Sequence, residues 1–239
     1  MKFTVLGKYG PYPPEGGATS GYFLECAGLK ILLDCGSGTA ARLQRLTGLE
    51  DLDAVVLSHL HQDHISDLGV LNYAMQTLTK KGLRRGKLPV YLPGGPADVR
   101  TMIRGFDHME ASVYGERLDF PGLSITLRPA QHPVPCYAML LQGEGRTFFY
   151  SGDTVYFEGL AELIKGADCA LMDACFLGEH PEGPHLSARQ AAVVARQAGA
   201  KRLYLTHVPP YADEAAYQRE ADAVFPGAQV VRELESYTV

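Results

Sequence analysis

The stretch Ala54-Val-Val-Leu-Ser-His-Leu-His-Gln-Asp-His64 decides how this chain of 239 residues is interpreted. A short apolar run ends at Leu57, and three histidines and one aspartate follow within six positions. Residues two positions apart in extended chain point to the same side, so His59 and His61 can offer imidazoles to one metal ion. Asp63 and His64 then turn toward a second ion. Imidazole with carboxylate is a donor set for Zn²⁺ first, with Mn²⁺ and Fe²⁺ as alternatives.

Four donors from one segment are too few for two metal ions, and the further candidates follow other predicted strands. His132 follows Thr126–Gln131, Asp153 follows Thr147–Gly152, and His207 follows Leu203–Thr206. Loops at the ends of rigid strands commonly carry the chemistry of a protein. The sequence therefore predicts seven donors at one edge of the fold.

Short apolar runs bounded by Gly, Pro and Asp predict strands, and longer periodic stretches predict helices. Two of the helices have an expected N-cap, Ser187 and Asp213. No Ser/Gly-rich linker divides the chain, so we expect one α/β domain over residues 1–239. The expected strands are Phe3–Leu6, Tyr22–Cys26, Lys30–Leu33, Ala54–Leu57, Val90–Leu92, Ile125–Arg128, Ala138–Leu141, Phe148–Tyr150, Ala170–Met172, Leu203–Thr206 and Gln229–Val231. The expected helices are Thr39–Thr47, Gly69–Thr79, Ala97–Phe106, Gly159–Ile164, Ser187–Ala198 and Asp213–Val224.

The order His-x-His-x-Asp-His, lone His, Gly-Asp-Thr and Leu-Thr-His resembles the metallo-β-lactamase-fold hydrolases. Within that superfamily the details resemble the ribonuclease Z and small phosphodiesterase branch, on four further segments: Asp34–Gly38, Ser151–Thr154, Met172–Phe176 and His185–Ser187. The resemblance implies a four-layer αββα sandwich, with two mixed sheets packed face to face, helices outside and a dimetal site at one edge.

The resemblance also implies two divalent metal ions per chain and a set of ligands. The implied sets are His59, His61 and His132 for one ion, Asp63, His64 and His207 for the other, and Asp153 bridging both.

Three residues receive catalytic roles in this interpretation. Asp63 would orient, or take a proton from, a metal-bridging hydroxide that attacks the substrate. His185, with Asp173 beside it, would assist proton transfer to the leaving group, because imidazole titrates near neutral pH. The function expected is a metal-dependent hydrolase, and specifically a phosphodiesterase for small or cyclic phosphodiesters.

Two departures from the ribonucleases bear on the substrate. Asp173 stands where the ribonucleases usually have Glu, and Cys175 where they have Thr. Only 21 positions separate His132 from Asp153, enough for a hairpin around Gly143 but not for the long arm that grips tRNA. This favours a small phosphodiester substrate over RNA, with tRNA 3′-processing as the alternative.

Charge and composition limit the partners. Lys and Arg number 22 against 27 Asp and Glu, a net charge of −5 that argues against broad nucleic-acid binding. The basic stretch Lys80–Lys87 is interpreted as a solvated loop, or alternatively as a rim that attracts phosphates. The five cysteines contain no C-x-x-C pair, and we expect them to be reduced, buried thiols. His108 and His180 fit no site pattern and are expected at the surface.

The location expected is cytoplasmic, with no membrane partner. No run of 18 apolar residues occurs, and the segment from Met1 to Gly7 reads as a first strand instead of a signal peptide. The sequence leaves the oligomeric state open, a homodimer included.

Other interpretations explain less of the chain. Cys35–Ala41 mimics a dinucleotide-binding glycine turn, but the charge of Asp34 would oppose a pyrophosphate. Hydrolysis of a lactone, thioester or β-lactam on the same fold stays open, because a fold does not fix a substrate. A non-catalytic metal-binding module would leave His185 without a role. No G-x-S-x-G motif for a serine hydrolase occurs.

Overall fold

The computed structural model describes residues 1–179 and 182–239, which form two mixed sheets of seven strands each. The first sheet has the order β14 (Ser236–Thr238), β1 (Lys2–Gly7), β2 (Gly21–Cys26), β3 (Leu29–Leu33), β4 (Ala54–Val56), β5 (Leu88–Leu92) and β6 (Met109–Val113). The second has the order β13 (Gln229–Val230), β12 (Leu203–Thr206), β11 (Cys169–Asp173), β10 (Arg146–Tyr150), β9 (Tyr137–Gly143), β8 (Leu123–Pro129) and β7 (Arg117–Phe120).

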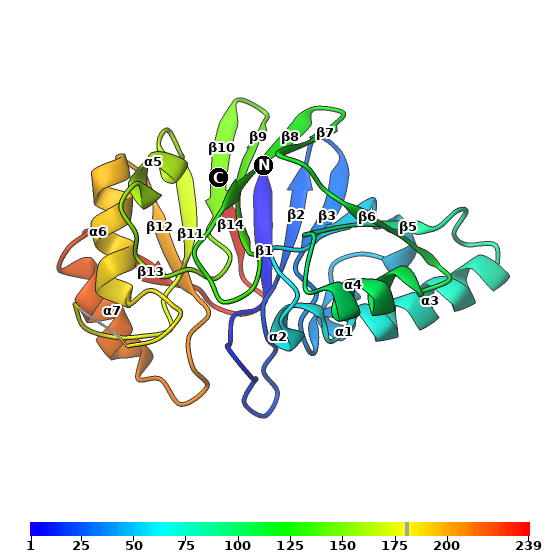
Figure 1. The fold of residues 1–239 in the computed structure, drawn as a ribbon, viewed down its shortest axis with the longest axis horizontal. Helices are drawn as coiled ribbons and strands as arrows, with labels where there is room; N and C mark the ends of the chain where they lie inside the picture. Colours follow the sequence, from blue (N-terminus) through cyan, green and yellow to red (C-terminus); the bar gives the residue numbers. More distant parts are fainter. Residues whose placement is uncertain (180–181) are drawn as a thin grey trace.

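Helices cover the outer face of each sheet, as Figure 1 shows. Those on the first sheet are α1 (Thr39–Leu43), α2 (Gln62–Ile65), α3 (Leu68–Lys80) and α4 (Ala97–Arg104), with a 3-10 turn at Leu49–Asp51. Those on the second are α5 (Leu160–Ile164), α6 (Ala188–Ala198) and α7 (Glu214–Asp222). The expected four-layer αββα sandwich is therefore confirmed.

The innermost core lies between the two sheets and is rich in aromatic rings. Phe3 of β1 stacks on Phe148 of β10 with ring centroids 4.7 Å apart, and Tyr22 and Tyr150 meet at 5.0 Å. Every residue of β11 is buried, because helices cover one face of its sheet and the other sheet covers the opposite face. Apolar strands of this kind are what the short runs in the sequence predict.

The chain leaves four strands at the same edge of the sandwich, at the bottom of Figure 1. His59 follows β4, His132 follows β8, Asp153 follows β10 and His207 follows β12. Each of these residues lies within three positions of the end of its strand. The parallel and antiparallel ladders thus bring four distant parts of the sequence to one site.

Between His132 and Asp153 the chain makes only the expected hairpin. Gly143 pairs with Arg146, so β9 and β10 are joined by the two residues Glu144 and Gly145. Both have positive φ, 52° and 69°, as in the type I′ turns that suit the twist of a hairpin.

The basic loop Lys80–Lys87 lies away from this edge. Helix α3 begins next to α2 and leads outward over 13 residues, about 20 Å, before the loop starts (Figure 1). The position and exposure of the loop favour the interpretation as a solvated loop over the alternative of a rim of the site.

The remaining expectations concern the cysteines, two further histidines and membrane-spanning helices. The five cysteines are free and buried. His108, expected at the surface, is half-buried directly before β6 and belongs to neither donor group, whereas His180 lies outside the described residues. None of the described helices combines the length and the apolar character needed to cross a membrane.

Candidate metal centre

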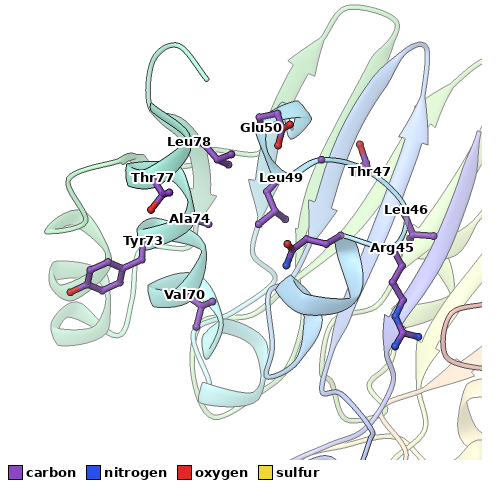
Figure 2. Close-up of a pocket in the computed structure, with 12 residues that line it drawn as sticks. Arg45, Leu46, Thr47, Leu49, Glu50, Val70, Tyr73, Ala74, Thr77 and Leu78 are labelled. Atoms are coloured by element: carbon purple, nitrogen blue, oxygen red, sulfur yellow. The ribbon is translucent and has the colours of Figure 1, made fainter. Parts of the chain in front are cut away.

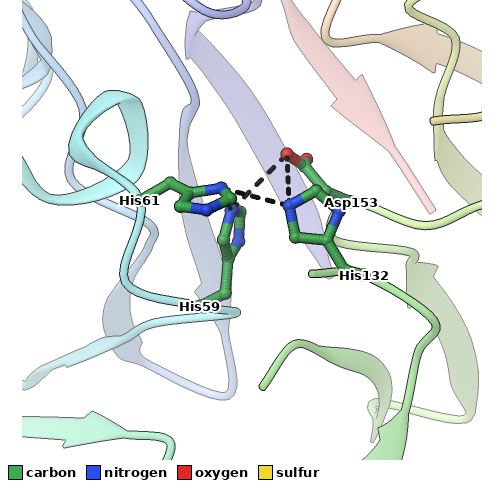
Figure 3. A group of neighbouring side chains, drawn as sticks. All are labelled: His59, His61, His132 and Asp153. Carbon is green, nitrogen blue, oxygen red and sulfur yellow. Dashed lines mark hydrogen bonds and ion pairs between the residues drawn. The ribbon is translucent and has the colours of Figure 1, made fainter. Parts of the chain in front are cut away.

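Two groups of donors meet at the lower edge of the sandwich. The first consists of His59, His61, His132 and Asp153, whose donor atoms all lie within 4.8 Å of one another (Figure 3). Nδ1 of His61 lies 3.1 Å from Nε2 of His59 and 3.1 Å from Nε2 of His132. The second group, within the same limit, consists of Asp63, His64 and His207.

Asp153 lies between the two groups. Its Oδ2 is 3.5 Å from Nε2 of His59, and 3.4 Å from Nε2 of both His64 and His207. Burial alone would raise the pKa of this carboxyl, but His207, His64 and His59 hold the pKa well below its usual range. One buried, ionised carboxylate oxygen is thus shared by both groups.

Outer partners fix which imidazole nitrogen faces the centre. His64 donates from Nδ1 to Asp34 over 2.8 Å, and His132 donates from Nδ1 to the carbonyl of Pro184 over 3.1 Å. Nδ1 of His59 is 3.1 Å from the hydroxyl of Ser58. In all three rings Nε2 therefore points inward, an arrangement that neighbouring groups commonly impose on metal-binding histidines.

The surroundings of Nε2 of His64 show whether a cation would fit between the two donor groups. It is buried and has no hydrogen-bond partner among the described residues, yet it faces carboxylate oxygens of Asp153 at 3.4 Å and of Asp63 at 3.6 Å. Burial alone would lower the pKa of His64, but Asp153, Asp34 and Asp63 hold the pKa well above its usual range. A lone pair facing two carboxylates requires positive charge between them, either a proton or a metal ion. The donor set fits divalent cations.

His185 and Asp173 form a pair beside this centre. Nδ1 of His185 lies 2.9 Å from Oδ2 of Asp173 and 3.8 Å from Oδ2 of Asp153. Asp173 is fully buried and also accepts from the backbone N–H groups of Thr154 and Cys175. Burial opposes the charged imidazole, but Asp173 outweighs it and raises the pKa of His185.

Asp34 is a site residue that sequence reasoning interpreted differently, as part of a glycine turn. Its Oδ1 accepts from the backbone N–H of Ser58, and its Oδ2 accepts from the hydroxyls of Ser58 and Tyr150 as well as from His64. The network orients His64. A charged residue directly after the apolar strand β3 was the available signal.

Two glycines are required by close packing around the centre. A Cβ on Gly36 would lie 2.1 Å from the carbonyl oxygen of Asp63, so the turn after β3 packs closely against the His-rich segment. A Cβ on Gly10 would lie 2.2 Å from the ring of His207. The glycine turn that mimics a dinucleotide fingerprint is thus explained by packing.

Comparison with known sequences gives the family. Residues 30–208 match the family described as the Beta-lactamase superfamily domain. The chain belongs to the beta-lactamase superfamily. The match spans the whole donor set, from the turn that holds Asp34 to His207.

Curated relatives within the superfamily cover nearly the whole chain. The "Probable metallo-hydrolase YhfI" of Bacillus subtilis is 34% identical over 95% of both chains. The "Ribonuclease Z" of Archaeoglobus fulgidus is 26% identical over 100% of this chain and 98% of its own. The chain is accordingly a metallo-hydrolase of the metallo-β-lactamase fold.

Solved structures agree on the architecture. The crystal structure of YhfI from Bacillus subtilis superposes with a TM-score of 0.94 at 30% identity, over 99% of this chain and 98% of that one. A diphosphatase from the PhnP family superposes with a TM-score of 0.79 over 99% and 96% of the two chains. At 18% identity the latter likeness shows the fold alone.

Proposed function

We propose that this enzyme is a phosphodiesterase that hydrolyses small or cyclic phosphodiesters with two divalent metal ions, Zn²⁺ first. The observation that carries the proposal is the pair of donor groups that share Asp153, with the His185–Asp173 pair alongside. The proposed ligands are His59, His61 and His132 for one ion, Asp63, His64 and His207 for the other, and Asp153 for both.

The metal ions, when bound, supply a nucleophile at neutral pH and stabilise negative charge on phosphoryl oxygens. The side chains of the enzyme do the rest. Asp63 would orient the attacking water molecule and accept its proton, since its Oδ2 lies in the second donor group, 3.1 Å from Nε2 of His207. His185 is placed to protonate the leaving oxygen, since its side chain is partly exposed and Asp173 keeps it charged to higher pH.

The size of the substrate follows from the segment between His132 and Asp153. This segment is described throughout and contains one hairpin with a two-residue turn, so no protruding arm is present there to hold a large RNA. The named activity of one relative, the ribonuclease Z of Archaeoglobus fulgidus, supports chemistry at phosphorus. Among phosphodiesters, the short hairpin favours a small substrate over pre-tRNA.

A substrate panel tests the proposal. We expect the Zn²⁺- or Mn²⁺-loaded enzyme to hydrolyse bis-p-nitrophenyl phosphate and 2′,3′-cyclic nucleotides faster than a lactone or a thioester, and to process pre-tRNA weakly or not at all. Faster turnover of the lactone or thioester would contradict the choice of phosphodiesters. Site-specific removal of a pre-tRNA 3′ trailer, faster than hydrolysis of the small diesters, would contradict the size argument.

Two histidine variants provide the matched control. His207→Ala removes a proposed ligand and is expected to lower kcat by at least about a hundredfold while the protein stays folded. His108→Ala removes a half-buried histidine that lies outside both donor groups and should leave kcat unchanged. Equal activity of the two variants would remove His207 from the site.

A further inference from the structure

Tyrosine side chains gather on the loops around the centre. Four tyrosines are largely exposed in the described chain: Tyr12 (55%), Tyr73 (71%), Tyr156 (46%) and Tyr211 (80%). Three of them lie on loops that contact the donor groups. The fourth, Tyr73, lies on α3 at a groove of about 750 Å³ in the outer helix layer, where Figure 2 shows it beside Val70 and Thr77.

Tyr12 and Tyr211 lie on two loops that are joined at their bases next to His207. Gly10 donates its N–H to the carbonyl of Val208 over 3.2 Å, and Gly10 contacts the His207 ring. Tyr12 is two residues beyond Gly10, at most about 7 Å of chain away. Both loops project from the lower edge of the sandwich in Figure 1. The two tyrosines are therefore within reach of whatever occupies the centre.

Prolines make these loops stiff. Tyr12 is flanked by Pro11 and Pro13, and Tyr211 follows Pro209 and Pro210, with a turn closed by the N–H of Ala212 on the carbonyl of Pro209. Proline fixes φ, so little backbone freedom remains to be lost when a ligand binds. Tyrosine itself has only two side-chain torsions and offers a large contact area at low entropic cost. Such residues are suited to bind a flat ring.

Tyr156 lies on a third loop, but its surroundings differ from those of Tyr12 and Tyr211. It lies three residues beyond Asp153 and lines a pocket of about 280 Å³ with Arg189 and Val193 of α6, and no donor residue lines that pocket. The N–H of Val155 is held by the carbonyl of Gln131, next to His132. The loop is thus anchored to the first donor group.

Cations close to these loops are already engaged with carboxylates. Lys8 pairs with Glu214 at 2.6 Å, Arg42 pairs with Glu233 at 2.5 Å, and Arg189 pairs with Glu179 at 3.0 Å. These three described cations are therefore paired, whereas the tyrosine rings on the loops are exposed. That composition favours recognition of the uncharged part of a substrate.

We infer that Tyr12 and Tyr211, here called the tyrosine rim, bind the base of a nucleoside phosphodiester whose phosphate lies at the two donor groups. This inference rests on the proposed phosphodiesterase function and adds the residues that would recognise the base. Aromatic side chains stack on any nucleobase, because every base has a π-face. The tyrosine rim therefore selects nucleosides over other diesters with little preference among bases.

The test compares two substrates that share the reacting group. Adenosine 2′,3′-cyclic phosphate and glycerol 1,2-cyclic phosphate both contain a five-membered cyclic phosphodiester, but only the first has a base. For Tyr12→Ala and Tyr211→Ala we expect KM for the adenosine substrate to rise about 5- to 150-fold, with kcat nearly unchanged. KM for the glycerol substrate should not change. Tyr12→Phe keeps the ring and should behave as wild type, and Tyr73→Ala is the control for an exposed tyrosine elsewhere.

A binding measurement separates this inference from the proposed function. Equilibrium dialysis of adenosine monophosphate and of inorganic phosphate is done with each loaded variant. If the variants bind the nucleotide more weakly but bind phosphate as before, the tyrosine rim is supported even when no diester is turned over. The absence of turnover would contradict only the phosphodiesterase proposal. Equal effects of the alanine variants on both substrates and both ligands, or no effect on either, would overturn the tyrosine rim. Thermal melting confirms that each variant is folded.

Discussion

At the scale of single residues, the centre depends on carboxylates that act on histidines. Asp34 orients His64 through Nδ1, and Asp173 does the same for His185. The two carboxylates are fully buried, where charges are poorly screened. Asp173 raises the pKa of His185, and Asp34 raises the pKa of His64 together with Asp153, whose effect is larger. The protonation state of the histidines is therefore set by residues that need not touch the substrate.

Asp173→Asn should move the alkaline limb of the pH–rate profile to lower pH. Asp173 raises the pKa of His185, and a proton donor is active below its pKa. Removing the negative charge lowers that pKa, so activity is lost at a lower pH as the pH rises. The measurement is kcat/KM against pH for both proteins.

Asp168→Asn is the matched control for this prediction. Asp168 directly precedes β11, whereas Asp173 is its last residue, and Asp168 pairs with Lys201 at 2.7 Å and belongs to neither donor group. We expect its profile to follow the wild type. An unshifted alkaline limb in Asp173→Asn would remove His185 as the proton donor.

At the scale of elements, the strands predicted from the sequence are mostly buried, and the strands that were missed are short or largely exposed. The eleven expected strands and six expected helices are all present. The missed strands β6, β7 and β14 are all edge strands, whose residues are largely exposed or few and so show no continuous apolar run. The missed helix α2 has four residues and lies within the His-rich segment.

The site was predictable where its residues follow one another in the chain. His59 to His64 form one segment, and the other donors come directly after apolar strands. The packing of Gly10 on His207 and the bond from Tyr150 to Asp34 join residues more than 100 positions apart, and no local pattern reports such contacts.

Ser187→Ala should weaken both helix α6 and the position of His185. Ser187 and Gln190 form a capping box, in which the side chain of each bonds the backbone N–H of the other. Loss of the cap should lower the free energy of unfolding by about 1 kcal/mol. His185 is two residues away, so we also expect a lower kcat, measured alongside denaturant unfolding.

Gly145→Ala is the control, because it should lower the free energy of unfolding by a similar amount at a position distant from the site. Gly145 has φ 69° in the β9–β10 turn, where an alanine is strained by about 1 kcal/mol. The turn lies at the end of β10 opposite to Asp153. A similar loss of kcat in both variants would show that the effect of Ser187→Ala is general destabilisation.

At the scale of the whole molecule, the centre joins the two halves of the sandwich. His59, His61, Asp63 and His64 follow a strand of the first sheet, whereas His132, Asp153 and His207 follow strands of the second. Ligands bound by both halves stabilise the folded state by mass action, because an unfolded chain does not hold the donors together.

We therefore predict about two divalent ions per chain and a lower unfolding temperature after chelation. Seven donors exceed the three or four protein ligands of a single Zn²⁺. Elemental analysis of the saturated protein and calorimetry with and without a chelator are the measurements. One ion or fewer per chain after saturation, or an unfolding temperature that chelation leaves unchanged, would contradict the dinuclear centre.

The separation of the donors along the chain has a consequence for biosynthesis. Asp63 and His207, whose side chains meet at 3.1 Å, are 144 positions apart. At about 5–20 residues per second, a ribosome needs roughly 7–30 s to travel from one to the other. During that time the early histidines exist as an incomplete chelator on a nascent chain. If His207 is a ligand as proposed, selection of the metal would be postponed until the second half of the protein has been made and folded.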